Sequence, residues 1–131
     1  MAYTVGVLCR SPMPVDLAAV LDDLLSHTGI IRNGRRSEGD DWCACDVQFG
    51  QSQWLTTLEV SRVAAHLTAL VESAAADGFA LDASRGDCFA IDLTLSGDVD
   101  WPPIVAFLGR VIEQHHGLLY DEVAGFKATL T

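Results

Sequence analysis

The sequence predicts a single α+β domain, residues 1–131, in which helices cover one face of an antiparallel sheet. Some segments alternate apolar and polar residues, as half-buried strands do, while others repeat apolar residues every three or four positions, as amphipathic helices do. The chain has 131 residues and is 50% hydrophobic. That length and that composition suffice for one domain that buries its own core.

The N-terminal part of the chain predicts a strand followed by a helix. Apolar and aromatic residues alternate from Tyr3 to Cys9, which favours a strand. Prolines in the following SPMP suit the entry to a helix. The helix is expected within residues 15–29, with Asp16 in the first turn, where a negative charge is favourable. The stripe expected to face the sheet is Leu17, Val20, Leu21, Leu24 and Thr28.

The middle of the chain predicts a loop and then a β-hairpin. Residues 30–41 contain glycines, an Asn-Gly pair and mixed charges, which are typical of an exposed loop. Residues 42–49 and 54–60 both alternate, and the GQSQ between them has the length of a hairpin turn. The faces of the first of these strands are expected to be Cys43, Cys45, Val47 and Phe49 toward the core, and Trp42, Ala44, Asp46 and Gln48 on the other side.

The second half of the chain predicts two helices that alternate with strands. Ser61 is placed to cap a helix that ends before Gly78, and residues 88–95 alternate as the next strand. Asp100 and the two prolines that follow mark the start of another helix, because first-turn positions need no intrahelical N–H partner. The strands expected after it are 118–120 and 125–130.

The order of these elements is strand, helix, strand, strand, helix, strand, followed by an added helix and strand. The leading part matches the split βαβ plan of ferredoxin-like folds. We therefore expect a ferredoxin-like βαββαβ core, with its helices on one face of the sheet and the other face open. One core is expected, made of Val5, Val7, Leu17, Leu21, Val47, Leu58, Leu67, Leu70, Ile91, Leu93, Phe107 and Val111.

The charge of the chain bears on its partners. Eighteen acidic residues against eight basic ones give a formal net charge of −10. Such a charge repels nucleic acid and anionic lipid and attracts cationic partners, although it also serves solubility. The N-terminus lacks the charged start and apolar run of a signal peptide, and no apolar stretch approaches the roughly 20 residues of a membrane span. A cytoplasmic location is therefore expected.

Cysteines could in principle form a metal or redox site. In a cytoplasmic protein Cys9, Cys43, Cys45 and Cys88 would stay reduced, and their spacing matches no common zinc pattern. Cys43 and Cys45 lie on the predicted core face, where a thiol behaves as a small hydrophobe. The chain also lacks a phosphate-cradling glycine loop, HExxH and GxSxG. We expect no catalytic residue and no cofactor or metal.

The segment VIEQHHGLLYDE invites two interpretations. His115 and His116 before Asp121 and Glu122 could form an acid/base or metal site. Adjacent helical residues point about 100° apart, however, and cannot easily ligate one metal, while Gly117 stands where a left-handed helix terminus is expected. We interpret the segment as a helix end, and a small enzyme or ligand-binding domain with a site here remains the alternative function.

The open sheet face offers a candidate binding surface. A tryptophan on an otherwise polar face is typical of protein interfaces, where aromatic anchors dominate the binding energy. The competing interpretation is that the third helix or the C-terminal strand covers this face. The candidate partner-binding residues are Trp42, Asp46, Gln48, Leu55, Glu59 and Asp92, with Asp40 and Asp41 at the rim.

The C-terminal segment DVDWPPIVAFLGRVIEQHHGLLYDEVAGF, residues 98–126, resembles a pattern of small acidic bacterial immunity proteins. The shared features are a helix that starts at Trp, a glycine, and a strand of apolar residues followed by Tyr-Asp; the adjacent histidines depart from the usual helix end. The resemblance implies a non-catalytic protein that binds and blocks a toxin of its own cell. Together with the charge, it predicts an immunity protein that binds a cationic toxin domain.

Overall fold

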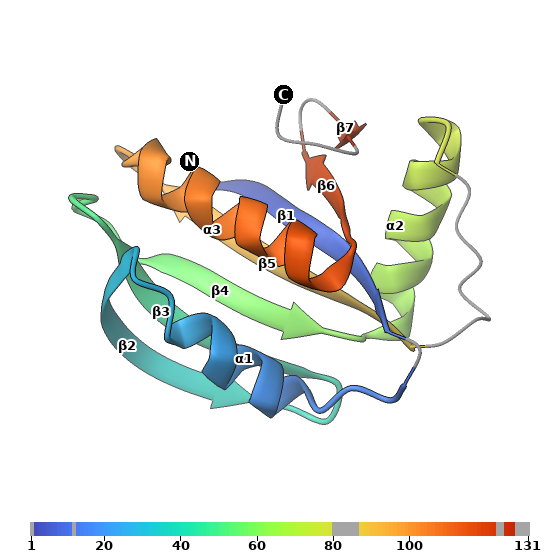
Figure 1. Ribbon diagram of the computed structural model, residues 1–131, viewed down its shortest axis with the longest axis horizontal. Coiled ribbons are helices and arrows are strands. Elements are labelled where there is room, and N and C mark those ends of the chain that lie inside the picture. Colours follow the sequence, from blue (N-terminus) through green and yellow to red (C-terminus); the bar gives the residue numbers. More distant parts are fainter. Residues whose placement is uncertain (1, 12, 80–86, 123–124, 128–131) are drawn as a thin grey trace.

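The computed structural model describes residues 2–11, 13–79, 87–122 and 125–127, which form one seven-stranded sheet and three helices (Figure 1). Every strand pairing in it is antiparallel, so the predicted α+β class is confirmed. In chain order the elements are β1 Ala2–Ser11, α1 Leu17–Leu25, β2 Ile30–Glu38, β3 Trp42–Phe49, β4 Thr56–Ser61, α2 Ala64–Ala76, β5 Asp87–Ser96, α3 Trp101–His115, β6 Leu118–Asp121 and β7 Gly125–Lys127.

The strand order across the sheet is β2-β3-β4-β5-β1-β6-β7. The long strands β1 and β5 pair along their whole length, from Ala2 opposite Ser96 to Ser11 opposite Asp87. Both strands bury alternate apolar residues on one face, such as Val5 and Val7 in β1 and Ile91 and Leu93 in β5, and the sequence displays this alternation. The sheet is larger than the predicted ferredoxin-like core, and the four strands of that core lie in the order β3-β4-β5-β1. In a ferredoxin-like core the first strand pairs with the third, whereas here β5 lies between β1 and β4, so the finer prediction of that core was wrong.

The first face of the sheet is covered by α1 and α3, which lie side by side over it (Figure 1). Val7, Leu58 and Ile91 point to this face from three strands and are fully buried. Leu21 of α1 and Phe107 of α3 pack against this face in the same core cluster. The predicted stripe of α1 forms at Leu17, Leu21 and Leu24, because burying a helix face against a sheet removes its apolar surface from water. Thr28, the last residue of that prediction, lies after the helix and is exposed.

The second face was expected to be free of helices, and this prediction was wrong. Leu8 and Tyr120 point to the side opposite Val7, and α2 packs on them with Ala74. The reason is that β1 and β6 place apolar residues on both of their faces, so each face needs cover. The predicted single core is therefore two clusters, and the partly buried Leu67 and Leu70 belong to the second.

The predicted loop at residues 30–41 is largely a strand, β2, and this prediction was wrong as well. β2 lies at the edge of the sheet, pairs only with β3 among the described residues, and is exposed from Ile31 to Glu38. An exposed edge strand buries little on either side, so it needs no apolar alternation. Charged residues there also discourage pairing with other chains. Arg36 forms an ion pair with Asp22 of α1 at 2.5 Å between Nη1 and Oδ1.

The starts of α1 and α3 agree with the predictions to within a few residues, whereas α2 is preceded by Val63 as its N-cap and Ser61, the predicted cap, is the last residue of β4. Asp16 caps α1, with its Oδ1 accepting from the backbone N–H groups of Ala18 and Ala19 at 3.1 and 3.3 Å. Asp100 precedes α3 but accepts instead from the backbone of Gln51, so it ties the helix to the β3–β4 turn. None of the helices in the described part of the chain is long and apolar enough to cross a membrane. The predicted strand end at 128–130 lies outside the described residues.

Candidate functional site

The candidate binding residues named from the sequence lie largely on the second face of the sheet. Trp42, Asp46 and Gln48 alternate with the buried Cys43, Cys45 and Val47, which point to α1 and α3. The register then places Thr57 opposite Asp46, and Glu59 opposite both Ala44 and Asp92. Strand periodicity therefore grouped these side chains as the structure does.

The cover of this face is partial. α3 lies on the other face, and β7 extends the sheet edge beside β6 instead of crossing the second face. α2 is the one described helix on this side, and its main contacts are with β5 and β7. The part of the second face formed by β2, β3 and β4 is what we call the uncovered face.

Two of the named apolar residues sit at the margins of the uncovered face. Trp42 packs against the β2–β3 turn: a Cβ added at Gly39 would lie 2.3 Å from its Nε1. Leu55, just before β4, is 37% exposed and reaches toward Gly34 of β2. Asp40 and Asp41 are exposed in the same turn as Gly39. The uncovered face thus has an indole at one end and a leucine near its edge strand.

A row of polar groups crosses the second face at its middle. Strand pairing aligns Glu59 of β4 with Asp92 of β5, Asp92 with Gly6 of β1, and Gly6 with Tyr120 of β6. His66, in the first turn of α2, reaches down to this row, and its Nε2 lies 2.8 Å from Oδ2 of Asp92. We call Glu59, His66, Asp92 and Tyr120 the polar row, and two of its members, Asp92 and Tyr120, lie on either side of Gly6.

Two buried oxygen atoms of the polar row converge above Gly6. Asp92 and Tyr120 are only 7% and 6% exposed, and within the described residues neither Oδ1 of Asp92 nor the Tyr120 hydroxyl has a hydrogen-bond partner. A Cβ added at Gly6 would lie 2.6 Å from that Oδ1 and 2.7 Å from that hydroxyl. Only glycine leaves room for both, since any side chain at this position would contact them.

The charges of the polar row alter its pKa values. The hydrogen bond to Asp92 raises the pKa of His66, and burial, followed by the charge of Asp92, raises the pKa of Glu59. Two carboxylates directly opposite each other on a sheet repel, and His66 relieves this only in its protonated form. The row can therefore hold a proton on His66 and favours additional positive charge near Glu59.

Sequence reasoning named Glu59 and Asp92 but missed His66 and Tyr120. His66 stands 26 residues before Asp92, and no spacing rule connects a helix residue to a strand that the helix meets only in the tertiary structure. Gly6 was the one available signal, because an isolated glycine in a strand often marks a close approach of other groups.

The bond between His66 and Asp92 is expected to make stability depend on pH. It raises the pKa of His66 above the ordinary 6.5 in the folded protein, so protonation stabilises the fold. This contribution is fully present below the unfolded pKa and is lost as the pH rises through the higher folded pKa. The free energy of urea unfolding should therefore fall, as the pH rises above about 6.5, more steeply in the wild type than in His66→Gln.

The other shifted histidines do not disturb this comparison. Burial lowers the pKa of His27 and His115, so their contribution has the opposite sign and is lost as the pH falls below 6.5. Both residues are present in the wild type and in His66→Gln, and their effect cancels in the difference. The same pH dependence in the two proteins would contradict a stabilising His66–Asp92 bond.

The C-terminal histidines end a helix, as predicted, but with different residues in the key roles. His116 itself adopts the left-handed conformation, with φ 49° and ψ 43°, where Gly117 was expected to do so. Gly117 is required for another reason: an added Cβ would lie 2.2 Å from Cγ1 of Val7. His115 packs edge-on against Phe89, with 5.4 Å between ring centroids, and burial lowers its pKa.

The acidic residues after the histidines have other neighbours. Asp121 accepts a hydrogen bond from the hydroxyl of Tyr3 and, in this way, raises the pKa of Tyr3 to about 12. The backbone N–H of Glu122 donates to the carbonyl of Thr4. His115 contacts Phe89 while Asp121 contacts Tyr3, so the structure does not bring the two together as one site.

The cysteines lie in the interior. Cys9, Cys43 and Cys45 belong to the first core cluster, and all four are free thiols and buried. Burial raises the pKa of Cys43, whose thiol donates to the carbonyl of Leu17 at 3.3 Å. Across the described ranges, no group of three or more His, Cys, Asp or Glu side chains is arranged to hold a metal ion.

Comparison with known proteins adds no relative. No family model, no curated protein and no solved structure matches the chain.

Proposed function

We propose that this chain is a non-catalytic binding protein that receives a cationic protein partner on the uncovered face. The observation that supports it best is the opposed pair Glu59 and Asp92. Burial, followed by the charge of Asp92, raises the pKa of Glu59, and a positive charge placed beside Glu59 would favour its ionised form and offset the repulsion. A partner with a basic surface would supply that charge.

The surroundings of the pair fit the same partner. Asp46 lies on the uncovered face, hydrogen-bonded to Thr57 at 3.2 Å, and Asp40 and Asp41 are exposed in the β2–β3 turn. Rim carboxylates of this kind steer a cationic partner during encounter, whereas aromatic side chains hold the complex. Trp42 is the aromatic side chain placed for the second role.

The kind of partner is the finer part of the proposal. The resemblance of residues 98–126 to immunity proteins, together with the net charge of −10, supports a cationic toxin domain as the protein that is bound and blocked. An immunity protein needs no catalytic group, and in this proposal the carboxylates of the uncovered face and of the β2–β3 turn attract and orient the partner.

Kinetic binding to the product of the neighbouring gene tests the proposal. Trp42→Ala should weaken affinity by about 2 kcal/mol, or roughly 30-fold, as the loss of an aromatic anchor does. Asp40→Asn with Asp41→Asn should mainly slow association and reduce its dependence on salt, because exposed charges act at long range. Measurements at two salt concentrations separate the two effects.

A matched control has the same change of charge elsewhere. Glu72→Gln with Glu113→Gln removes two exposed carboxylates on α2 and α3, away from the uncovered face. It should change the association rate much less than the Asp40 and Asp41 pair. The uncovered face is rejected as the binding site if Trp42→Ala leaves the affinity unchanged and the two double variants slow association equally.

The second candidate function is a small enzyme or ligand-binding domain. The His66–Asp92 pair favours it, because a carboxylate that orients an imidazole is a common general-base arrangement. His66→Gln separates the two functions. It should leave partner affinity within about threefold if the chain is a binding protein, and it should abolish turnover if His66 is a general base.

A further inference from the structure

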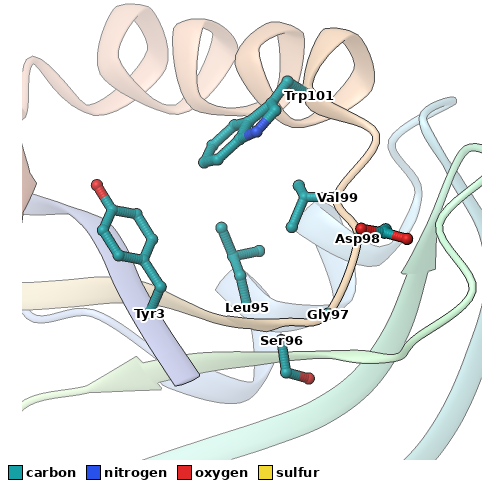
Figure 2. A pocket seen from close by; sticks show the side chains of 7 residues that line it. All are labelled: Tyr3, Leu95, Ser96, Gly97, Asp98, Val99 and Trp101. Atoms are coloured by element: carbon teal, nitrogen blue, oxygen red, sulfur yellow. The ribbon is translucent and has the colours of Figure 1, made fainter. Parts of the chain in front are cut away.

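A pocket of about 450 Å³ lies at the end of the sheet where β1 begins and β5 ends, beneath the start of α3 (Figure 2). It is on the side of α1 and α3, far along the strands from Trp42, which pairs with Ser61 at the opposite end of β4. Its volume is in the range of pockets that hold small ligands. Nothing proposed for the uncovered face uses it.

The walls of the pocket are aromatic and its floor is aliphatic. Figure 2 shows the rings of Tyr3 and Trp101 on two sides, with Leu95 between them and Val99 below Trp101. The ring centroids are 6.4 Å apart and the planes are at 83°, so the two rings form an edge-to-face pair. Trp101 is 45% exposed, although Leu95 below it is buried. A ligand could therefore contact the rings and the floor together.

Carboxylates lie near Tyr3 and at the rim of the pocket. The Tyr3 hydroxyl donates to Asp121, and the charges of Asp121 and Glu122 also act on Tyr3. A phenol that donates to a carboxylate has a more electron-rich ring, which strengthens its attraction for a cation. Asp98 stands at the rim, with its carboxylate turned away from the two rings (Figure 2).

We propose that this pocket binds an organic cation, a guanidinium or alkylammonium group on an apolar stem. The stem lies against Leu95 and Val99, and the charged group lies against the rings of Tyr3 and Trp101 within the field of Asp98, Asp121 and Glu122. An anion would be repelled by these carboxylates, and a neutral apolar ligand would gain from the floor alone. This inference is independent of the proposed function.

Butylguanidinium and its neutral isostere butylurea provide the test. Each is titrated into ¹⁵N-labelled full-length protein, and the indole N–H resonances of the three tryptophans are followed. Butylguanidinium should shift the Trp101 resonance with a dissociation constant at least about fivefold lower than that of butylurea, the difference expected for cation–π contact. The Trp42 resonance, at the opposite end of the strands, reports general attraction of cations to an acidic protein and should move less.

Variants locate the site. Trp101→Leu should abolish the preference for butylguanidinium over butylurea, as judged from the resonances of residues 95–99, while Trp42→Leu should keep it. Trp101→Leu keeps an apolar side chain at a half-exposed position, and its thermal unfolding checks that it folds. Tyr3→Phe retains the ring but loses the bond to Asp121, and it should weaken the preference without removing it.

The outcomes are distinct. Equal affinity for the two probes, or an unchanged preference in Trp101→Leu, overturns the proposal. A third probe, N-acetyl-arginine methylamide, identifies the source of the cation. An affinity equal to that of butylguanidinium supports a free small molecule, whereas a tighter interaction supports an arginine within a protein segment.

Discussion

Replacing Ile91 with alanine is expected to lower the free energy of unfolding by about 2–5 kcal/mol. Ile91 is fully buried in β5, paired with Val7 of β1 and with Val60 of β4, and it packs in the cluster that α1 and α3 cover. Its neighbours belong to four elements that cannot all move inward, so truncation would leave a cavity as well as lose apolar contact. Urea unfolding of the variant and the wild type measures the difference.

Leu67→Ala is the matched comparison for Ile91→Ala. Leu67 is only partly buried, in the smaller cluster between α2 and the second face. Its truncation removes less buried surface and lets α2 adjust, so we expect a loss of about 1–2 kcal/mol. A loss at Leu67 as large as the loss at Ile91, or a loss below about half a kilocalorie at Ile91, would contradict the two-cluster core.

Gly6→Ala is the second change with a large expected effect, about 1–3 kcal/mol or more of lost stability. The new methyl group would lie 2.6 Å from Oδ1 of Asp92 and 2.6 Å from the carbonyl oxygen of Ile91. The second of these atoms belongs to the backbone of a paired strand and cannot rotate away. The alanine would also press on Asp92 and so disturb its bond to His66.

Tyr120→Phe tests whether crowding within the polar row causes the loss of stability in Gly6→Ala. The Tyr120 hydroxyl is buried and, among the described residues, has no hydrogen-bond partner, so removing it alone should change stability little. In the double variant with Gly6→Ala, the missing hydroxyl gives the methyl group room, and part of the loss should be recovered. Additive effects of the two changes, or a neutral Gly6→Ala, would show that the space above Gly6 is not tight.

Local periodicity predicted most of the elements. β1, β3 and β5 each bury one face fully, and that burial imposes the alternation from which they were predicted. β2 was not predicted as a strand, because an edge strand whose residues are exposed needs no alternation of apolar and polar residues. The left-handed residue at the end of α3 was misplaced by one position, since close packing against Val7, and not a positive φ, requires Gly117.

The candidate binding surface was predictable only in part. Alternation placed Trp42, Asp46 and Gln48 on one face, since side chains two residues apart in a strand share a side. It could not show that Trp42 packs on Gly39, or that the more exposed indoles are those of Trp54 and Trp101. Exposure of a loop or helix-start residue depends on what lies beside it, and that is set by the fold.

The sequence by itself determined the types of most elements, the two sides of each inner strand and the acidic charge, because these follow from local pattern and composition. Tertiary structure alone decided that α2 covers part of the second face and that Glu59, Asp92, Gly6 and Tyr120 meet in one row. The physical reason is that strand order and register arise from pairings between distant segments. A local pattern fixes which side of a strand a residue faces, but only those pairings fix its neighbours.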